Sequence, residues 1–122
     1  MEKSGRLHLL SEGQQCWPNK IDLCYMDGHT PGQIIPVIHH PKRSVVFTAD
    51  FIPTLSHVSQ LWIAAYDLFP LAAMKEKEEF MNTAQINDWG LFFQHDAYTE
   101  SATLERKDGI VKGVKTDLSF IK

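Results

Sequence analysis

The feature that most constrains the fold of this chain is a short turn sequence, DGHTPG at residues 27–32, between two apolar runs. These runs, residues 21–26 and 33–38, predict two strands joined by the turn. His29 lies between two glycines in a turn that Pro31 stiffens, so backbone geometry holds the residue and leaves its ring free. A histidine presented in this way is either a metal ligand or a solvated side chain at the tip of an ordinary hairpin.

Two later stretches end in residue types that bind metals. Residues 44–50 (SVVFTAD) form an apolar, β-branched run that ends in Asp50, and residues 91–96 (LFFQHD) form an apolar run that ends in His95 and an aspartate. Each pattern predicts a buried strand with an imidazole or a carboxylate at its mouth. Together with His29 these residues are too widely spaced for a zinc finger, so only a folded sheet could bring them together.

The rest of the pattern predicts helices and a hairpin around these strands. Apolar residues at helical spacing predict a helix or helical loop after the second run: Leu55, Val58, Leu61 or Trp62, and Ala65. A second helix is expected from near Pro70 to about Asn87, with the charged residues 75–79 (KEKEE) on a solvated face. The second of the two strands around the turn is expected to extend to residue 39. Further strands are expected at residues 7–10, 45–48 and 91–93, with a hairpin at 103–114. This order predicts an α/β or α+β fold with one mixed sheet and helices on one face.

Composition narrows the class of protein. The 122 residues are 43% hydrophobic and 22% charged, which is typical of one soluble globular domain, here residues 1–122. The net charge of −3 provides no broad basic surface, so nucleic acid is not an expected partner. No apolar stretch approaches membrane-spanning length and the first residues lack a secretory signal, so we expect no membrane association and a cytoplasmic location.

The other histidines and the cysteines give weaker signals. His8 is expected to be packed or at a strand edge, because no ligand type lies nearby at a suitable spacing. His39 and His40 point to opposite sides of a strand, so they are expected to be a solvated pair rather than ligands of one ion. Cys16 and Cys24 are too far apart for a metal knuckle or a redox pair, so two reduced thiols are expected.

Taken together, the turn at residues 27–32, the strand ending in Asp50 and the strand ending at His95 resemble the second half of the metallo-β-lactamase superfamily of zinc-dependent hydrolases. Within the superfamily the resemblance is to the lactonase-like and organophosphate-hydrolase-like branch, and it covers residues 7–120. The first ligand motif of the family, His-x-His-x-Asp-His, occurs nowhere in the chain. The resemblance therefore implies the C-terminal half of a metallo-β-lactamase-like αββα sandwich.

The resemblance also implies roles for the three candidate ligands. His29 would bind the first metal, Asp50 would bridge both metals as the catalytic carboxylate, and His95 would bind the second. Zinc is the implied metal, with manganese or iron as alternatives. Each ion would receive only two ligands from this chain, and zinc sites usually have about four ligands. We therefore expect weak metal binding and little or no turnover by the chain alone.

The resemblance implies small-molecule substrates with ester, lactone or phosphoester bonds. Gln33 stands where many relatives have a second histidine, and Pro53 stands where some lactonases have a tyrosine. The resemblance to lactonases is therefore weaker than the resemblance to the superfamily. The connection after Asp50 carries three possible pocket residues: His57, Trp62 and Tyr66. Core packing is the favoured interpretation for the last two of these residues, and that of His57 stays open. Asp96 is expected to orient a ligand or cap backbone groups.

The predicted strands are apolar on both sides, which is typical of a sheet covered on both faces. Helices can cover one face of the sheet. We therefore expect the other face to pack against the missing N-terminal half or a second copy of this chain. The alternative function is non-enzymatic: a truncated domain that keeps the fold as an interaction module.

Overall fold

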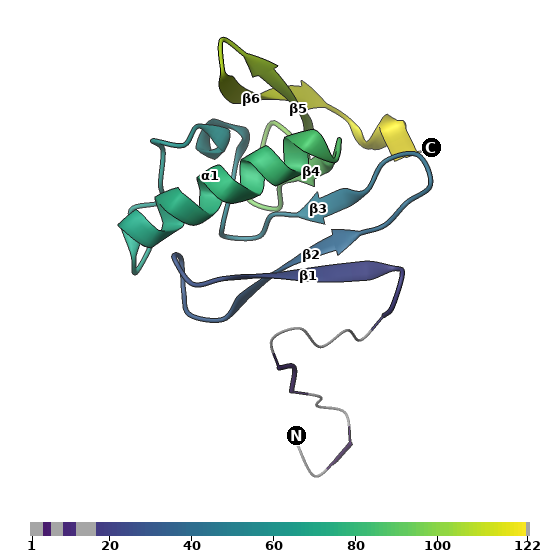
Figure 1. Cartoon of the computed structure of the whole chain (residues 1–122), viewed down its shortest axis with the longest axis vertical. Helices are drawn as coiled ribbons and strands as arrows, with labels where there is room; N and C mark the ends of the chain where they lie inside the picture. Colours follow the sequence, from purple (N-terminus) through teal and green to yellow (C-terminus); the bar gives the residue numbers. More distant parts are fainter. Residues whose placement is uncertain (1–3, 6–8, 12–16, 122) are drawn as a thin grey trace.

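Among the residues that the structure describes, six strands form a single sheet in which spatial order follows sequence order (Figure 1). The computed structural model describes residues 4–5, 9–11 and 17–121. The strands are β1 Ile21–Met26, β2 Gln33–Ile38, β3 Val45–Phe47, β4 Gly90–Phe92, β5 Ser101–Lys107 and β6 Ile110–Thr116. Only β3 and β4 are parallel, and every other neighbouring pair is antiparallel. The predicted mixed sheet is confirmed.

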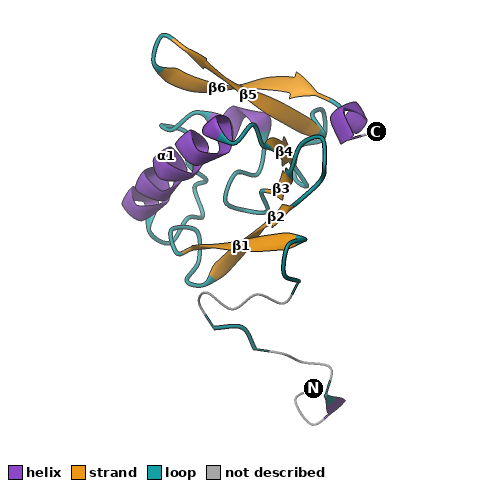
Figure 2. Ribbon diagram, turned by 45° about the vertical axis from the view of Figure 1, so that its right-hand side comes forward, coloured by secondary structure: helices purple, strands orange, loops and turns teal. Residues whose placement is uncertain are grey.

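The parallel pair requires a crossover connection, which contains the helix α1 Pro70–Ile86. Pro70 begins the helix because the first helical position needs no backbone N–H, and the helix ends within one residue of the predicted boundary. Figures 1 and 2 show α1 lying along one face of the sheet. The prediction of one helix-covered face is therefore confirmed.

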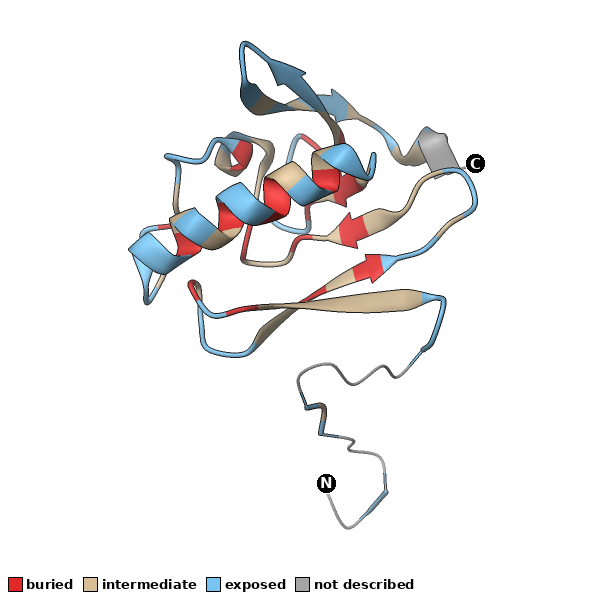
Figure 3. Ribbon diagram, viewed as in Figure 1, coloured by how far each residue is buried: buried red, intermediate tan, exposed pale blue. Residues whose placement is uncertain are grey.

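The core lies between α1 and the sheet. Val37, Val46 and Leu91 follow one another across three neighbouring strands in register, and each is completely buried. From the helix, Phe80 places its ring edge-on against Phe51, with 5.4 Å between ring centroids. Figure 3 shows the buried residues distributed along α1 and in the strands beside it. This core fixes the ends of β3 and β4, where two of the candidate ligands follow.

The opposite face of the sheet is also apolar, but it is only partly covered. On this outer face Phe47 and Phe92 stack at 5.8 Å between ring centroids, and Ile38 is 44% exposed. The strand register places the following apolar residues on the outer face: Leu23, Tyr25, Ile34, Pro36, Ile38, Val45, Phe47 and Phe92. All of them except Ile38 are half-buried. The alternation inherent in strand geometry therefore leaves an apolar surface on the side away from α1.

The helix or helical loop predicted over residues 55–65 forms only in part. Of residues 55–65, only the short 3-10 helix η2 Leu55–Val58 forms, and an irregular loop follows it. The backbone is extended both before η2, at Thr54, and after it, at Ser59, so the helical spacing does not continue. The Lys77 ammonium donates a hydrogen bond to the Trp62 carbonyl and thereby ties this loop to α1.

The expectations near the N-terminus are only partly covered by the structure. Leu9 and Leu10 have no strand conformation, so these two residues do not form the predicted strand. His8 and Cys16 lie outside the described residues. Cys24 is a free, half-buried thiol, and burial next to Asp22 raises its pKa. A second 3-10 helix, η3 Leu118–Ile121, follows β6.

The prediction of a fully solvated charged face on α1 is also wrong. Lys77 is only 2% exposed and packs beneath the loop that carries Trp62. Glu76 is half-buried and contacts the β1–β2 turn. Alternating charges in a sequence do not show which side chains a neighbouring loop covers, and this segment was predicted only as a helix or helical loop.

Replacing Lys77 with methionine should change the pH dependence of stability. Burial lowers the pKa of Lys77 from 10.5 to about 8, although the nearby Asp67 charge opposes this shift. The unfolded chain therefore binds more protons than the folded chain between about pH 8 and 10.5, so the wild-type free energy of unfolding should rise with pH across this window. Urea unfolding should show that the free energy of unfolding rises less with pH in Lys77→Met than in wild type. In the exposed control Lys75→Met, the rise with pH should equal that of wild type. Equal rises in all three proteins would contradict this account.

Candidate metal centre

The structure brings His29, Asp50 and His95 together at one edge of the sheet. His29 lies in the β1–β2 turn, Asp50 follows β3, and His95 follows β4. Because β3 and β4 are parallel, the residues that follow them leave the sheet at the same edge. His29 Nε2 lies 3.8 Å from Asp50 Oδ2, and His95 Nε2 lies 2.5 Å from Asp50 Oδ1. The two imidazoles thus approach the two oxygens of one carboxylate.

A tight turn holds Asp50 at this edge. Ala49 has a left-handed backbone, with φ of +47°, so the chain reverses immediately after β3. The fully buried Thr48 anchors the reversal: its hydroxyl donates to the Ile52 carbonyl at 2.7 Å, and its own carbonyl accepts from the Phe51 and Ile52 amides. The Asp50 side chain remains 41% exposed and can be reached by a ligand.

A second carboxylate orients the ring of His29. Nδ1–H of His29 donates to Asp67 Oδ1 at 2.9 Å, and the side chains are only 16% and 6% exposed. With its proton on Nδ1, the imidazole keeps a lone pair on Nε2, the nitrogen that faces Asp50. Metal-binding histidines are commonly held by a carboxylate in this way. Asp67 was missed by sequence reasoning, since only the fold brings the loop before α1 to His29.

The donor types fit zinc, but their number does not complete a site. Imidazole nitrogens and a carboxylate are ordinary zinc ligands, and an exposed carboxylate leaves room for a substrate. Within the part of the chain that the structure describes, no group of three or more His, Cys, Asp and Glu side chains is arranged to hold a metal ion. Asp50 instead takes part in two separate pairs, one with each histidine.

Asp96 caps backbone groups, as the sequence suggested. Its carboxylate accepts hydrogen bonds from the amides of Tyr98 and Thr99 at 2.9 Å and of Leu55 at 3.0 Å. Burial opposes the ionised form, but these three donors, with the Lys115 charge, lower the pKa of Asp96. The carboxylate therefore fixes the loop beyond His95 against η2.

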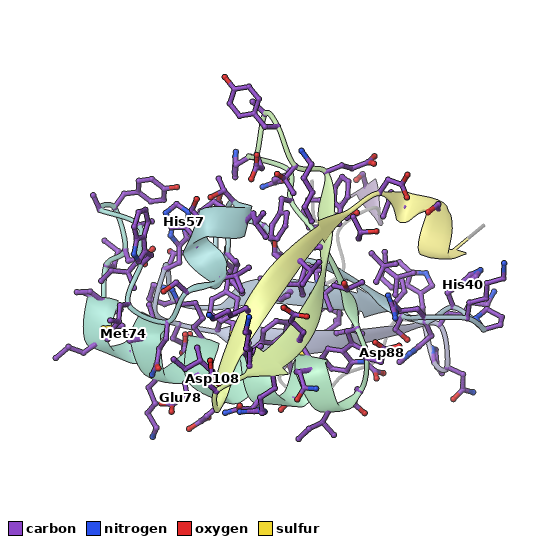
Figure 4. The ribbon with its side chains drawn as sticks, turned by 90° about the horizontal axis from the view of Figure 1, so that it is seen from above. His40, His57, Met74, Glu78, Asp88 and Asp108 are labelled. Carbon is purple, nitrogen blue, oxygen red and sulfur yellow. The ribbon has the colours of Figure 1, made fainter. Side chains whose placement is uncertain are left out.

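The three possible pocket residues differ in their exposure and in their contacts. Trp62 and Tyr66 are 61% and 60% exposed, so the expectation that they pack in the core is wrong. Tyr66 instead contacts the His29 ring edge-on, at 5.5 Å between ring centroids. His57 lies in η2, where Nδ1 is 2.7 Å from the Thr54 hydroxyl (Figure 4). Burial and the Lys77 charge lower the pKa of His57.

The remaining histidine pair does not form a shared site. His39 Nε2 pairs with Asp22 at 2.9 Å, whereas His40 Nδ1 accepts a hydrogen bond from the Lys42 amide at 3.3 Å. Figure 4 places His40 at the opposite end of the molecule from His57. The His39–Asp22 pair therefore provides a matched internal control for the pairs around Asp50.

Comparisons with known proteins identify the fold. No family model matches the sequence. No curated protein matches it either. Among solved structures, a probable metal-dependent hydrolase from Staphylococcus aureus superposes with a TM-score of 0.76 at 25% identity, covering 94% of this chain and 42% of that chain. The dizinc quorum-quenching lactonase AidC gives a TM-score of 0.76 at 14% identity. The match covers 94% of this chain and 40% of the AidC chain.

A third structure, the hydrolase AbOPH of the beta lactamase superfamily, gives a TM-score of 0.69 at 17% identity and covers 83% of this chain. The present chain spans only 36% to 42% of the length of these three proteins. The chain therefore has a partial metallo-β-lactamase fold. No helix among the described residues is both long and apolar enough to cross a membrane.

Proposed function

We propose that this chain is the C-terminal half of a metal-dependent hydrolase that cleaves ester, lactone or phosphoester bonds in small molecules. The observation that carries the proposal is the approach of two imidazoles to one carboxylate, at 3.8 Å and 2.5 Å. Similarity to a probable metal-dependent hydrolase and to a dizinc lactonase supports the reaction class and makes zinc the first metal to test.

Each residue has a distinct role in this proposal. His29 and His95 would each hold one ion, and Asp50 would be shared between both ions. Asp67 would keep the proton of His29 on Nδ1 and so leave Nε2 available. Bound zinc would supply a water of lowered pKa and polarise the substrate bond.

The incomplete ligand set implies a partner. Two ligands per ion hold zinc weakly, so the missing ligands would come from a segment carrying His-x-His-x-Asp-His. The outer face, with Phe47 and Phe92 stacked on it, supports a partner that packs sheet against sheet. A second copy of this chain is the competing occupant of that surface. The same apolar surface favours the alternative function, a non-catalytic interaction module.

Metal analysis of three variants tests the proposal. Wild-type chain should retain zinc or manganese only weakly, and His29→Ala or Asp50→Ala should abolish the binding, because each removes a ligand from a site that has too few. Asp22→Ala is the matched control, since it removes the carboxylate from a similar imidazole pair outside the site. The measurement is elemental analysis after dialysis against a range of free metal concentrations.

Stoichiometric metal that survives both site substitutions would contradict the assignment of His29 and Asp50. Equal loss in Asp22→Ala would show that binding is not specific to the candidate centre.

A further inference from the structure

We propose that Glu76 of α1 is a positioning residue that sets the His29 ring against Asp50 by holding the backbone of the β1–β2 turn. The role in metal binding rests on the proposed function, whereas the control of the turn does not. Glu76 lies in the charged segment of α1, and nothing in its sequence surroundings distinguishes it from its acidic neighbours.

The two oxygens of the Glu76 carboxylate accept hydrogen bonds from two successive amides of the turn. The Asp27 amide donates to Oε1 at 2.9 Å, and the Gly28 amide donates to Oε2 at 3.0 Å. Hydrogen bonds to an ionised acceptor are stronger than those between neutral groups, and a bidentate arrangement also fixes orientation. The carboxylate therefore restrains the backbone immediately before His29.

The carbonyls of the same turn are held by the segment that leads into α1. The Phe69 amide donates to the Gly28 carbonyl at 2.8 Å, and the Leu68 amide donates to the His29 carbonyl at 3.1 Å. Figures 1 and 2 both show the β1–β2 turn beside the first turns of α1. The backbone of His29 is thus fixed by the start of α1, and its ring is fixed by Asp67 from the same lead-in segment.

Close contact makes the attachment to the helix specific. A Cβ atom built on Gly28 would lie 2.4 Å from both the amide nitrogen and the Cα of Ala73, so the turn lies directly against the helix backbone. An ordinary hairpin turn has no such attachment and its amides face water. Here Glu76, one helical turn after Ala73, reaches the amides from the same helix face.

The neighbouring glutamates make different contacts. Glu78 accepts a hydrogen bond from the Gln60 side chain at 2.9 Å, and Glu79 lies 3.9 Å from Lys75 with its side chain 70% exposed. Glu79→Ala is therefore a matched control, because it removes an acidic side chain from the same helix without touching the turn. Glu76→Gln is the conservative variant, since it retains one carbonyl oxygen as an acceptor.

The test uses NMR of the full chain, first without metal. In Glu76→Ala, the amides of Asp27 and Gly28 lose their hydrogen-bond acceptor. They should therefore exchange with solvent about 10-fold faster, which corresponds to a loss of about 1.4 kcal/mol of protection. The His29 ring nitrogen shifts should move away from the state with the proton on Nδ1. Glu79→Ala should have the same amide exchange rates and His29 shifts as wild type. Both quantities in Glu76→Gln should lie between those of wild type and Glu76→Ala. Circular dichroism checks that α1 remains folded in each variant.

Zinc titration then tests the link to the candidate centre. The zinc concentration needed to change the His29 ring nitrogen shifts should be about 10-fold higher in Glu76→Ala than in wild type. This is the loss of metal affinity expected when a group that orients a ligand is removed. Unchanged amide exchange and unchanged His29 nitrogen shifts in Glu76→Ala would overturn the positioning role. Absence of any zinc effect on wild-type His29 would instead overturn the proposed function, and the metal-free spectra would still decide the role of Glu76.

Discussion

Mixing this chain with a segment that supplies His-x-His-x-Asp-His in the first-half fold of the family should produce hydrolase activity, of which we expect little or none from the chain alone. In the proposed function each ion would be held by one histidine and the shared Asp50, and the added segment would supply the remaining ligands. Ester, lactone and phosphotriester substrates should be assayed with added zinc or manganese. Asp50→Ala should prevent the gain of activity, and the control Asp22→Ala should allow it.

Formation of the complex can be measured separately from catalysis. Light scattering should show the chain associating with the added segment, because the outer face around Phe47 and Phe92 is apolar and only partly covered. Association without turnover would favour the interaction-module alternative. Turnover by the isolated chain that is lost in Asp50→Ala would show that two ligands per ion suffice, or that two copies share a site.

Gly28→Ala should destabilise the protein by about 3 kcal/mol or more, the upper range for forcing an extra methyl group into a packed site. The new Cβ would lie 2.4 Å from the backbone nitrogen and Cα of Ala73, and a helix backbone cannot move aside as a flexible side chain can. Relieving the clash would separate the β1–β2 turn from α1, with loss of the Glu76 hydrogen bonds and displacement of His29. Urea unfolding monitored by circular dichroism measures the effect.

Gly32→Ala provides the comparison for this prediction. Gly32 lies in the same turn with φ of +75°, but its added Cβ would meet no atom within 4 Å. Gly32→Ala should therefore lower the free energy of unfolding by only about 1 kcal/mol, the cost of placing a side chain at a positive φ. Equal losses of stability in the two variants would show that contact with Ala73 is not what makes Gly28 necessary.

Much of the fold could be predicted from local sequence. The strand Ile21–Met26 and the helix that begins at Pro70 match their predicted bounds closely, because each is marked by its own periodicity and by a turn or a proline at its end. The approach of His29 and His95 to Asp50 was anticipated through the resemblance of three motifs to the metallo-β-lactamase superfamily, and their roles as metal ligands remain a proposal.

The details that depend on contacts between distant residues could not be predicted. The loop after η2 is irregular and is tied to α1 by Lys77, whose burial no local pattern reveals. Asp67 reaches His29 across 38 positions in sequence, and Glu76 reaches Gly28 across 48. These carboxylates resemble ordinary surface residues until the fold places them beside the turn.

The location of bound zinc tests the central claim most directly. Crystals of the chain soaked in zinc and measured at the zinc absorption edge should show anomalous density beside the Asp50 carboxylate, adjacent to His29, His95 or both. That density should disappear in Asp50→Ala. Anomalous density beside His39 and Asp22, with none near Asp50, would contradict the assignment of the candidate centre.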